Sequence, residues 1–267
     1  MTSPPTIPVV MAISGSDPTG GAGIQADIET LASMGCHTAP VTTAITVQDT
    51  QQVISYSCVD TPMLVQQARA VLEDMSVKLF KIGFLGCAET VTAVHSLLVD
   101  YPDIPVVLDP VLVTGNGSDF TDDDTLMAMI QLLIPLTTVL TPNSIEAQIL
   151  ANGADTLEAC GQELLDMGCK YVLITGTHEQ NKHVINTLYH DRQQVESYSW
   201  ERLPNHYHGS GCTLASAIAG LLARDIEPLT AIREAQEYTW EALHQGYRLG
   251  MGQLIPNRLF WAHDKKD

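Results

Sequence analysis

Basic residues are scarce in this sequence. Lys and Arg together number 13 against 31 Asp and Glu, which gives a formal net charge of −18 over 267 residues. Nucleic acids and anionic lipid surfaces attract cationic proteins, so this balance argues against either as the main partner. It does not exclude an anionic nucleotide, because backbone amides or a metal ion can create a local positive field. The simplest role of the acidity is solubility.

Cysteine is also sparse, and long hydrophobic runs are missing. The six cysteines form no C-x-x-C pair and no cluster, so we expect reduced thiols that mostly fill the core. The apolar stretch 7–13 is too short for a membrane span, and without a basic flank it does not resemble a signal peptide. We therefore expect a cytoplasmic protein that binds neither membrane nor nucleic acid.

Several common catalytic motifs are missing as well. No lysine follows a glycine, so there is no Walker A phosphate loop, and neither G-x-S-x-G nor H-E-x-x-H occurs. His206 and His208 have no third metal ligand at a useful spacing, and we interpret them as polar loop residues. Any chemistry must therefore depend on other segments.

The pattern of apolar residues indicates a mixed α/β fold. The predicted strands are 9–14, 38–47, 79–82, 106–108, 138–140 and 171–174, and the main predicted helices are 22–34, 61–75, 212–223 and 229–247. Strands that are almost continuously apolar and alternate with helices favour a mostly parallel sheet with helices on both faces, a three-layer sandwich. Residues 183–190 and 195–200, joined by the polar residues 191–194, predict a hairpin. No linker divides the chain, so we predict one domain, 1–267.

The strongest candidate for chemistry is the segment 208–212, which leads into a predicted helix. Its two glycines, Gly209 and Gly211, let backbone N–H groups face an anion, and the helix start adds about half a positive charge. Such a site suits the charge that develops on a transferred phosphoryl group. Cys212 would lie where the pKa of a thiol tends to fall, so that a thiolate could act as base. The alternative is a plain glycine-rich helix start with a buried cysteine.

A second glycine-rich segment, 15–23, joins the first predicted strand to the first predicted helix. Four glycines in nine positions allow a ligand to approach the backbone closely. Residues 21–26 also match the G-x-G-x-x-A dinucleotide pattern. That match is weak, because Pro18 intervenes after the strand and no acidic residue ends the second strand.

Two acidic residues follow strands at the expected ligand-binding edge of the sheet. Asp109 and Glu146 can converge on a Mg²⁺ held mainly through water, as in many phosphoryl-transfer sites. Taken alone, the pattern favours Glu146 as an ordinary carboxylate in the first turn of a helix, with Asn143 or Ser144 as its cap.

Together these segments resemble the hydroxymethylpyrimidine/phosphomethylpyrimidine kinases of thiamine biosynthesis, members of the ribokinase superfamily. The matching stretches follow the family's order and spacing and are 14–27, 46–50, 81–85, 107–111, 140–143 with 146–147, and 208–214. The resemblance implies a ribokinase-like α/β sandwich and a homodimer. It also implies ATP-dependent phosphorylation of 4-amino-5-hydroxymethyl-2-methylpyrimidine with Mg²⁺, and it leaves phosphorylation of the monophosphate open.

The resemblance also assigns residues by position. It places five residues around the pyrimidine: Gly15, Ala22, Asp27, Gln48 and Phe84. It makes Cys212 the catalytic base, with Gly209 and Gly211 around the transferred group. It gives Asp109 and Glu146 to the metal, and to the nucleotide it gives Asn143, Thr175, Gly176 and Ser210.

The chain departs from the family pattern in several places. Phe84 stands where methionine is usual, and residues 175–178 read Thr-Gly-Thr-His where Lys-Gly-Gly-His is frequent. The loop 114–119 also lacks a Lys or Arg sometimes found there. With two cations missing, we expect the second phosphorylation to be slower than the first. The tail 253–267 matches poorly, and we assign it no role.

Three alternatives stay open. A pyridoxine or pyridoxal kinase shares the fold and, in some members, the Gly-x-Gly-Cys ending. An NAD-binding oxidoreductase would use the glycines of 21–26 but leaves 209–212 unexplained. A ligand sensor without catalytic activity is conceivable because cations have been lost.

Overall fold

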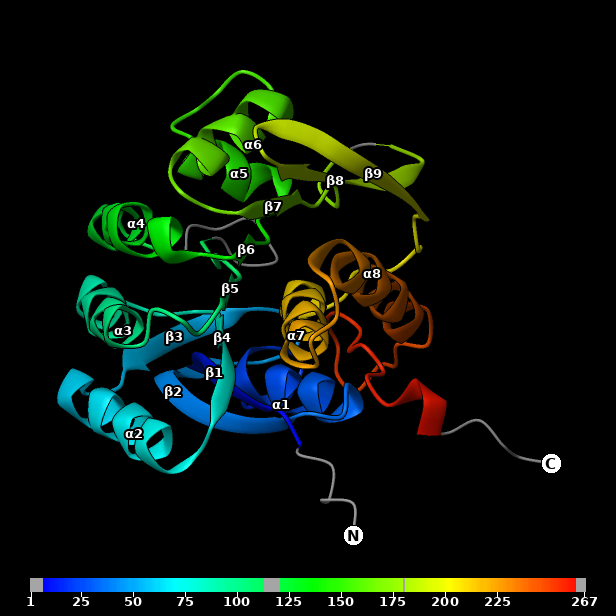
Figure 1. Ribbon diagram of the computed structural model, residues 1–267. Coiled ribbons are helices and arrows are strands. Elements are labelled where there is room, and N and C mark those ends of the chain that lie inside the picture. Colours follow the sequence, from blue (N-terminus) through cyan, green and yellow to red (C-terminus); the bar gives the residue numbers. More distant parts are fainter. Residues whose placement is uncertain (1–6, 113–120, 180, 263–267) are drawn as a thin grey trace, which may run out of the picture.

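The computed structural model describes residues 7–112, 121–179 and 181–262, and Figure 1 shows their arrangement. The strands are β1 (Val9–Ser16), β2 (His37–Gln48), β3 (Val53–Cys58), β4 (Val77–Ile82), β5 (Val106–Leu108), β6 (Val139–Leu140), β7 (Tyr171–Ile174), β8 (His183–His190) and β9 (Gln193–Glu201). The α-helices are α1 (Gly23–Ser33), α2 (Thr61–Asp74), α3 (Ala88–Asp100), α4 (Asp123–Ala128), α5 (Ser144–Leu150), α6 (Leu157–Asp166), α7 (Ser210–Ala223) and α8 (Pro228–His244).

The strands form one sheet in the order β3-β2-β1-β4-β5-β6-β7-β8-β9. Strands β2 to β7 in that order are parallel, whereas β3 and the β8–β9 hairpin run antiparallel at the two edges. The predicted mostly parallel sheet is confirmed. The edge strand β3 was not predicted, because its segment is short and its residues are largely exposed, so no buried apolar run marks it.

Helices cover both faces of the sheet. One buried cluster joins Met11, Phe80 and Ile82 to apolar residues of α2, α3, α5 and α6. The second joins Val10 and Leu79 to α1, α7 and α8. Figure 1 shows α2, α3 and α4 along one face and α1, α7 and α8 together on the other. Helix α7 is buried around most of its circumference, which explains why its sequence is apolar without a polar stripe.

The predicted hairpin is present, but its turn is shorter than 191–194. Gln193 already belongs to β9, and only Asp191 and Arg192 separate the two strands. Their φ angles are 49° and 60°, the conformation that a two-residue hairpin turn requires at both positions. Among the described residues, no helix combines the length and apolar character that a membrane crossing demands.

Because β1, β2, β4, β5, β6 and β7 are parallel, their carboxyl ends lie at one edge of the sheet. Ligands of open α/β sheets bind at this edge. The start of α7 reaches the same edge from the helical layer. The fold thus brings together segments that are far apart in the sequence, such as those of Gly15 and Ser210, which are 195 residues apart.

Candidate active site

A cavity of about 1020 Å³ opens at the carboxyl ends of the parallel strands. Its volume is at the upper end of the usual range for small-molecule sites. Twelve of the predicted site residues line it: Gly15, Ala22, Gln48, Phe84, Asp109, Asn143, Glu146, Thr175, Gly209, Ser210, Gly211 and Cys212. Residues predicted for four different roles, in catalysis and in binding pyrimidine, nucleotide and metal, therefore line the same cavity.

Two predicted residues do not line the cavity. Asp27 lies beneath it with no exposed surface, where its Oδ1 accepts a hydrogen bond of 2.7 Å from Ser216 Oγ and lies 2.7 Å from Lys81 Nζ. The position of Asp27 therefore does not favour the direct contact with the pyrimidine that the sequence predicts. Gly176 faces β8, where its N–H donates to Asn186 Oδ1. Any other residue at position 176 would bring its β-carbon to 2.2 Å from the carbonyl oxygen of Ile185.

The two glycine-rich segments meet at the cavity wall. Gly209 caps α7 with a φ of +82°, and a β-carbon there would lie only 1.9 Å from the carbonyl oxygen of Gly21. Glycine is thus required twice, for the backbone conformation and for the close approach. Because the first N–H groups of a helix have no partner within the helix, the start of α7 presents free donors to the cavity.

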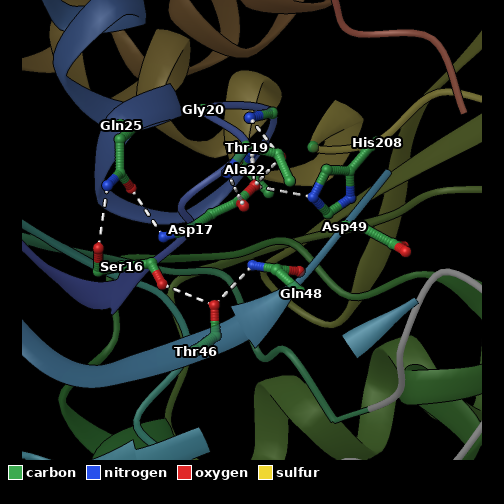
Figure 2. Close-up of polar contacts among 12 residues, drawn as sticks. Ser16, Asp17, Thr19, Gly20, Ala22, Gln25, Thr46, Gln48, Asp49 and His208 are labelled. Atoms are coloured by element: carbon green, nitrogen blue, oxygen red, sulfur yellow. Dashed lines mark hydrogen bonds and ion pairs between the residues drawn. The ribbon is translucent and has the colours of Figure 1, made fainter. Parts of the chain in front are cut away.

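Asp17 organises the first glycine-rich segment, as Figure 2 shows. Its buried carboxylate accepts hydrogen bonds from Thr19 N–H, from the Thr19 hydroxyl and from Ala22 N–H at 2.7–2.9 Å. His208 Nε2 lies 2.8 Å from Asp17 Oδ2 and ties this segment to the one before α7. Burial would raise the pKa of Asp17, but the hydrogen bonds from His208 and Thr19 outweigh it and lower the pKa. The sequence alone indicates only a polar loop residue at His208 and no particular role for Asp17, so this link is a finding of the structure.

Cys212 lies among buried charged groups at the floor of the cavity. Burial raises the pKa of its thiol to about 12, although the Lys81 ammonium acts in the opposite direction. The prediction that the helix start would yield a thiolate is therefore wrong for the ligand-free protein, because loss of hydration outweighs the helix dipole. The thiol also forms a hydrogen bond with Asp109.

Asp109 is itself unusual. Burial raises the pKa of its carboxyl to about 6, Lys81 opposes the rise, and Asp27 adds to it. Its Oδ2 atom is buried without a hydrogen-bond partner, as are Ser14 Oγ and Asp27 Oδ2. Burial would lower the pKa of Lys81, but Asp27, Cys212 and Asp109 together raise it, so the ammonium stays charged. The buried Lys81 ammonium thus balances acidic groups at the floor of the cavity and below it.

The side wall holds the residues predicted to bind the pyrimidine. Gln48 donates from Nε2 to Thr46 Oγ1 at 2.9 Å, and Thr46 donates to the carbonyl oxygen of Ser16 at 2.8 Å. This leaves the second amide hydrogen and the carbonyl oxygen of Gln48 for a ligand. Phe84 packs edge-to-face on Tyr56, with ring centroids 5.1 Å apart, and a β-carbon at Gly15 would lie 2.9 Å from its ring.

Glu146 belongs to a capping box at the start of α5. Asn143 Oδ1 accepts from Ile145 and Glu146 N–H, and Glu146 Oε2 accepts from Asn143 N–H at 3.0 Å. The helix-capping interpretation of Glu146 is therefore confirmed. Its carboxylate still lines the cavity, as does that of Asp109. Within the described ranges, no group of three or more His, Cys, Asp or Glu side chains is placed to hold a metal ion.

The far end of the cavity combines aromatic surface with cationic side chains. Gln236 Oε1 accepts from Trp200 Nε1 and from Asn186 Nδ2 at 3.1 and 2.9 Å. Arg202 donates to three carbonyl groups of the loop that follows β7, those of Thr177, Glu179 and Asn181. Lys182 also lines this end. Residues 175–178 carry no Lys or Arg, but Lys182, just before β8, and Arg202, just after β9, line this end of the cavity. The loop 114–119 lies outside the described residues.

Comparisons with known proteins agree with one another. Residues 17–257 match the family described as phosphomethylpyrimidine kinase. Hydroxymethylpyrimidine/phosphomethylpyrimidine kinases of Streptomyces coelicolor and Rhizobium meliloti are 37% and 34% identical to this chain. The alignments cover 98% and 92% of this chain and 97% and 94% of those proteins. A thiamine biosynthesis bifunctional protein of Geobacter sulfurreducens is 34% identical over 97% of this chain, which spans about half (54%) of that protein.

Solved structures give the same fold. A phosphomethylpyrimidine kinase of Clostridium difficile superposes with a TM-score of 0.77 at 30% identity, covering 89% of this chain and 99% of that one. A Bacillus subtilis pyridoxal kinase, solved as an ADP complex, gives a TM-score of 0.86 at 26% identity, with 95% and 99% covered. A Staphylococcus aureus pyridoxal kinase in complex with an ATP analogue, AMP-PCP, gives 0.86 at 23% identity and 98% and 97% coverage, which concerns the fold alone.

The raised pKa of Asp109 predicts a stability cost. A carboxyl with an ordinary pKa of 3.8 that titrates near 6 when folded favours folding only while protonated, so stability is lost as pH rises through that interval. The loss is at most about 3 kcal/mol. Asp109→Asn should therefore unfold at higher urea concentration than the wild type at about pH 8, and the difference should shrink towards about pH 5.

The exposed Asp103→Asn variant is the control for this measurement. It should follow the wild type at both pH values. An Asp109→Asn variant that is less stable than the wild type at the higher pH would show that the ionised carboxylate contributes net stability.

Proposed function

This chain belongs to the phosphomethylpyrimidine kinase family, and from that premise we propose how its residues divide the reaction. It is a hydroxymethylpyrimidine/phosphomethylpyrimidine kinase of thiamine biosynthesis that uses ATP. The observation that carries the proposal is the convergence of Gln48, Cys212 and the start of α7 in one cavity. Gln48 supplies an amide that can recognise the pyrimidine ring, Cys212 supplies a base, and the start of α7 supplies an anion site. A phosphoryl transfer needs all three.

We propose that the pyrimidine lies against Gly15, Ala22 and Phe84, with the Gln48 amide on its ring nitrogen and exocyclic amine. The open donor and acceptor of Gln48 match that pair of groups. The close packing of Gly15 on Phe84 leaves a flat aromatic wall on which a ring can stack. Asp27, which lies below the cavity, would act through Lys81 rather than by contact.

The nucleotide is assigned to the other half of the cavity. This assignment rests on Asn143, Thr175 and Ser210, which line the cavity, with Gly176 next to Thr175 in the chain. The indole of Trp200 and the polar groups of Gln236 suit a planar base with hydrogen-bonding edges. The start of α7 would face the phosphates, where its N–H groups stabilise developing negative charge.

In the proposed reaction, the hydroxymethyl oxygen attacks the terminal phosphorus of ATP. The bond from that phosphorus to the bridging oxygen breaks, ADP leaves, and the hydroxyl proton passes to Cys212. The thiol pKa of about 12 means that only a small fraction of the ligand-free protein holds the basic thiolate near neutral pH. Turnover should therefore rise with pH in the alkaline range, as expected for a base of high pKa.

Mg²⁺ fits this site on one observation. Asp109 Oδ2 is a buried carboxylate oxygen without a hydrogen-bond partner, and it lines the same cavity as Glu146. Mg²⁺ in such sites takes one or two carboxylates, the remaining positions being filled by phosphates and water. We propose that Asp109 and Glu146 hold the ion, whose chemistry when bound is to neutralise charge on the phosphates.

Three further proposals concern the whole protein. We propose one domain over 1–267, a cytoplasmic location and a homodimer. Ile45 and Val47 support the dimer, because they project from the same face of β2 and are 61% and 55% exposed. Isolated apolar side chains at a surface are common, but a pair on an edge region of a sheet is a candidate contact for a second copy.

Pyridoxine or pyridoxal phosphorylation is the second candidate, because pyridoxal kinases share this fold at high TM-scores. The Gln48 amide distinguishes pyridoxine from hydroxymethylpyrimidine. Pyridoxine lacks the exocyclic amine, so its complex would leave one polar group of the pocket unpaired, at a cost of roughly 1–3 kcal/mol.

Specificity constants for hydroxymethylpyrimidine, its monophosphate and pyridoxine test the proposed function. We expect the specificity constant for hydroxymethylpyrimidine to exceed that for pyridoxine by about 5- to 150-fold, which corresponds to the cost of that unpaired group. Gln48→Leu should erode this preference, and Gln52→Leu, a change on the adjacent exposed turn, should leave it intact. Pyridoxine ahead of the pyrimidine would overturn the proposal. A second phosphorylation as fast as the first would show that the missing cations are replaced.

A Mg²⁺ titration of activity tests the metal assignment. Asp109→Asn and Glu146→Gln should each need more Mg²⁺ for half-maximal activity, because each removes one anionic oxygen donor. Glu73→Gln, at an exposed position on α2, serves as the control. Unchanged titrations in both site variants would place the ion elsewhere.

A further inference from the structure

After α8 the chain returns to the active site. Gly252 and Gln253 donate backbone hydrogen bonds to Thr50, in the turn between β2 and β3, at 3.0 and 2.8 Å. Leu254 exchanges two backbone hydrogen bonds with the segment before α7, one from His208 N–H and one to the carbonyl oxygen of His206. This C-terminal segment, 252–258, thus contacts the loop beside Gln48 and the loop that leads to Cys212.

Arg258 ends the segment inside the protein, with 1% of its surface exposed. Its guanidinium donates to the carbonyl oxygen of Gly21, to that of Gly20 at 3.4 Å, and to Glu29 Oε2 at 3.0 Å. Its Nε donates to Thr213 Oγ1 at 3.0 Å, in the first turn of α7. A cation buried this deeply requires full pairing, and the chain supplies acceptors from both glycine-rich segments.

The contacts of Arg258 continue to the helix cap. Thr213 Oγ1 donates to the carbonyl oxygen of Gly209 at 2.8 Å, and Gly209 lies against Gly21, which is also held by Arg258. One guanidinium therefore fixes both sides of the contact on which the start of α7 depends. On the cavity side of this contact, the Asp17–His208 pair forms a second, independent link.

We propose that Arg258 is a positioning residue for phosphoryl transfer, which holds the start of α7 in register with the segment 15–23. The inference rests on the proposed function, because it concerns the geometry of that reaction. Arg258 does not line the cavity, so it acts through Gly21 and Thr213 rather than by touching a substrate.

This placement predicts which kinetic constant changes. The α7 N–H groups must lie close to the oxygens on which charge develops, and a displacement of about 1 Å can cost about 100-fold in rate. ATP and the pyrimidine also contact many residues that Arg258 does not hold. Loss of the guanidinium should therefore lower kcat more than it raises either KM.

Lysine is a poor substitute at this position. Its single ammonium cannot reproduce a planar fork that reaches Gly21 and Thr213 at once. Arg258→Lys should accordingly retain the charge and the fold but only part of the turnover. Thr213→Val keeps the side-chain shape and removes the hydroxyl that joins Arg258 to Gly209, so it tests the same link from the other end.

The experiment measures kcat, both KM values and the unfolding temperature for the full-length wild type, Arg258→Ala, Arg258→Lys and Thr213→Val. Arg69→Ala is the control, since Arg69 forms an ion pair with Asp100 at the surface. We expect kcat of Arg258→Ala to fall about 10- to 100-fold with smaller changes in KM. Added guanidinium ion, far below denaturing concentrations, should restore part of this kcat and should not affect Arg69→Ala.

Two results would overturn the inference. One is a folded Arg258→Ala with wild-type kcat, and the other is a variant whose lower activity follows its folded fraction alone and does not respond to guanidinium. If Arg258→Ala fails to fold, Arg258→Lys and Thr213→Val decide, and wild-type kcat in both would contradict the proposal. Failure of the wild type itself to phosphorylate hydroxymethylpyrimidine would be a failure of the proposed function instead.

Discussion

The two glycine-rich segments of the active site touch through their backbones. No side chain fits between Gly209 and the carbonyl oxygen of Gly21, where a β-carbon would lie 1.9 Å from the oxygen. This contact brings the start of α7 to the carboxyl end of β1, and with it Cys212 to the floor of the cavity. The rest of the site depends on it, because the anion site and the pyrimidine wall belong to these two different segments.

The position of Cys212 has an electrostatic cost. Asp27, Lys81 and Asp109 lie near the thiol and are largely removed from water, and several of their polar atoms have no hydrogen-bond partner. Burial raises the pKa of both Cys212 and Asp109, because loss of hydration disfavours the charged form of each group. Perturbed groups of this kind are frequent at catalytic sites, where substrate and metal supply the missing partners. The Lys81 ammonium limits the cost by balancing the acidic groups.

The sequence predicts the layers, the parallel sheet and most of the cavity lining, because apolar runs and glycine-rich helix starts are local signals. Properties that depend on burial were not predictable in this way. The pKa of Cys212 follows from loss of hydration, and the position of Asp27 follows from its pairing with Lys81. Arg258 lies in a tail that matched no motif, and its role depends on contacts across more than 230 residues of sequence.

The turnover of a Cys212→Ala variant tests the central claim most directly, with Cys36→Ala as a control that removes another buried thiol. If Cys212 accepts the hydroxyl proton, the variant should lose about 10²–10⁴-fold in kcat. ATP affinity should change little, and the rise of turnover with alkaline pH should disappear. A Cys212→Ala variant with wild-type turnover and pH profile would show that the cysteine is structural and that the proton leaves by another route.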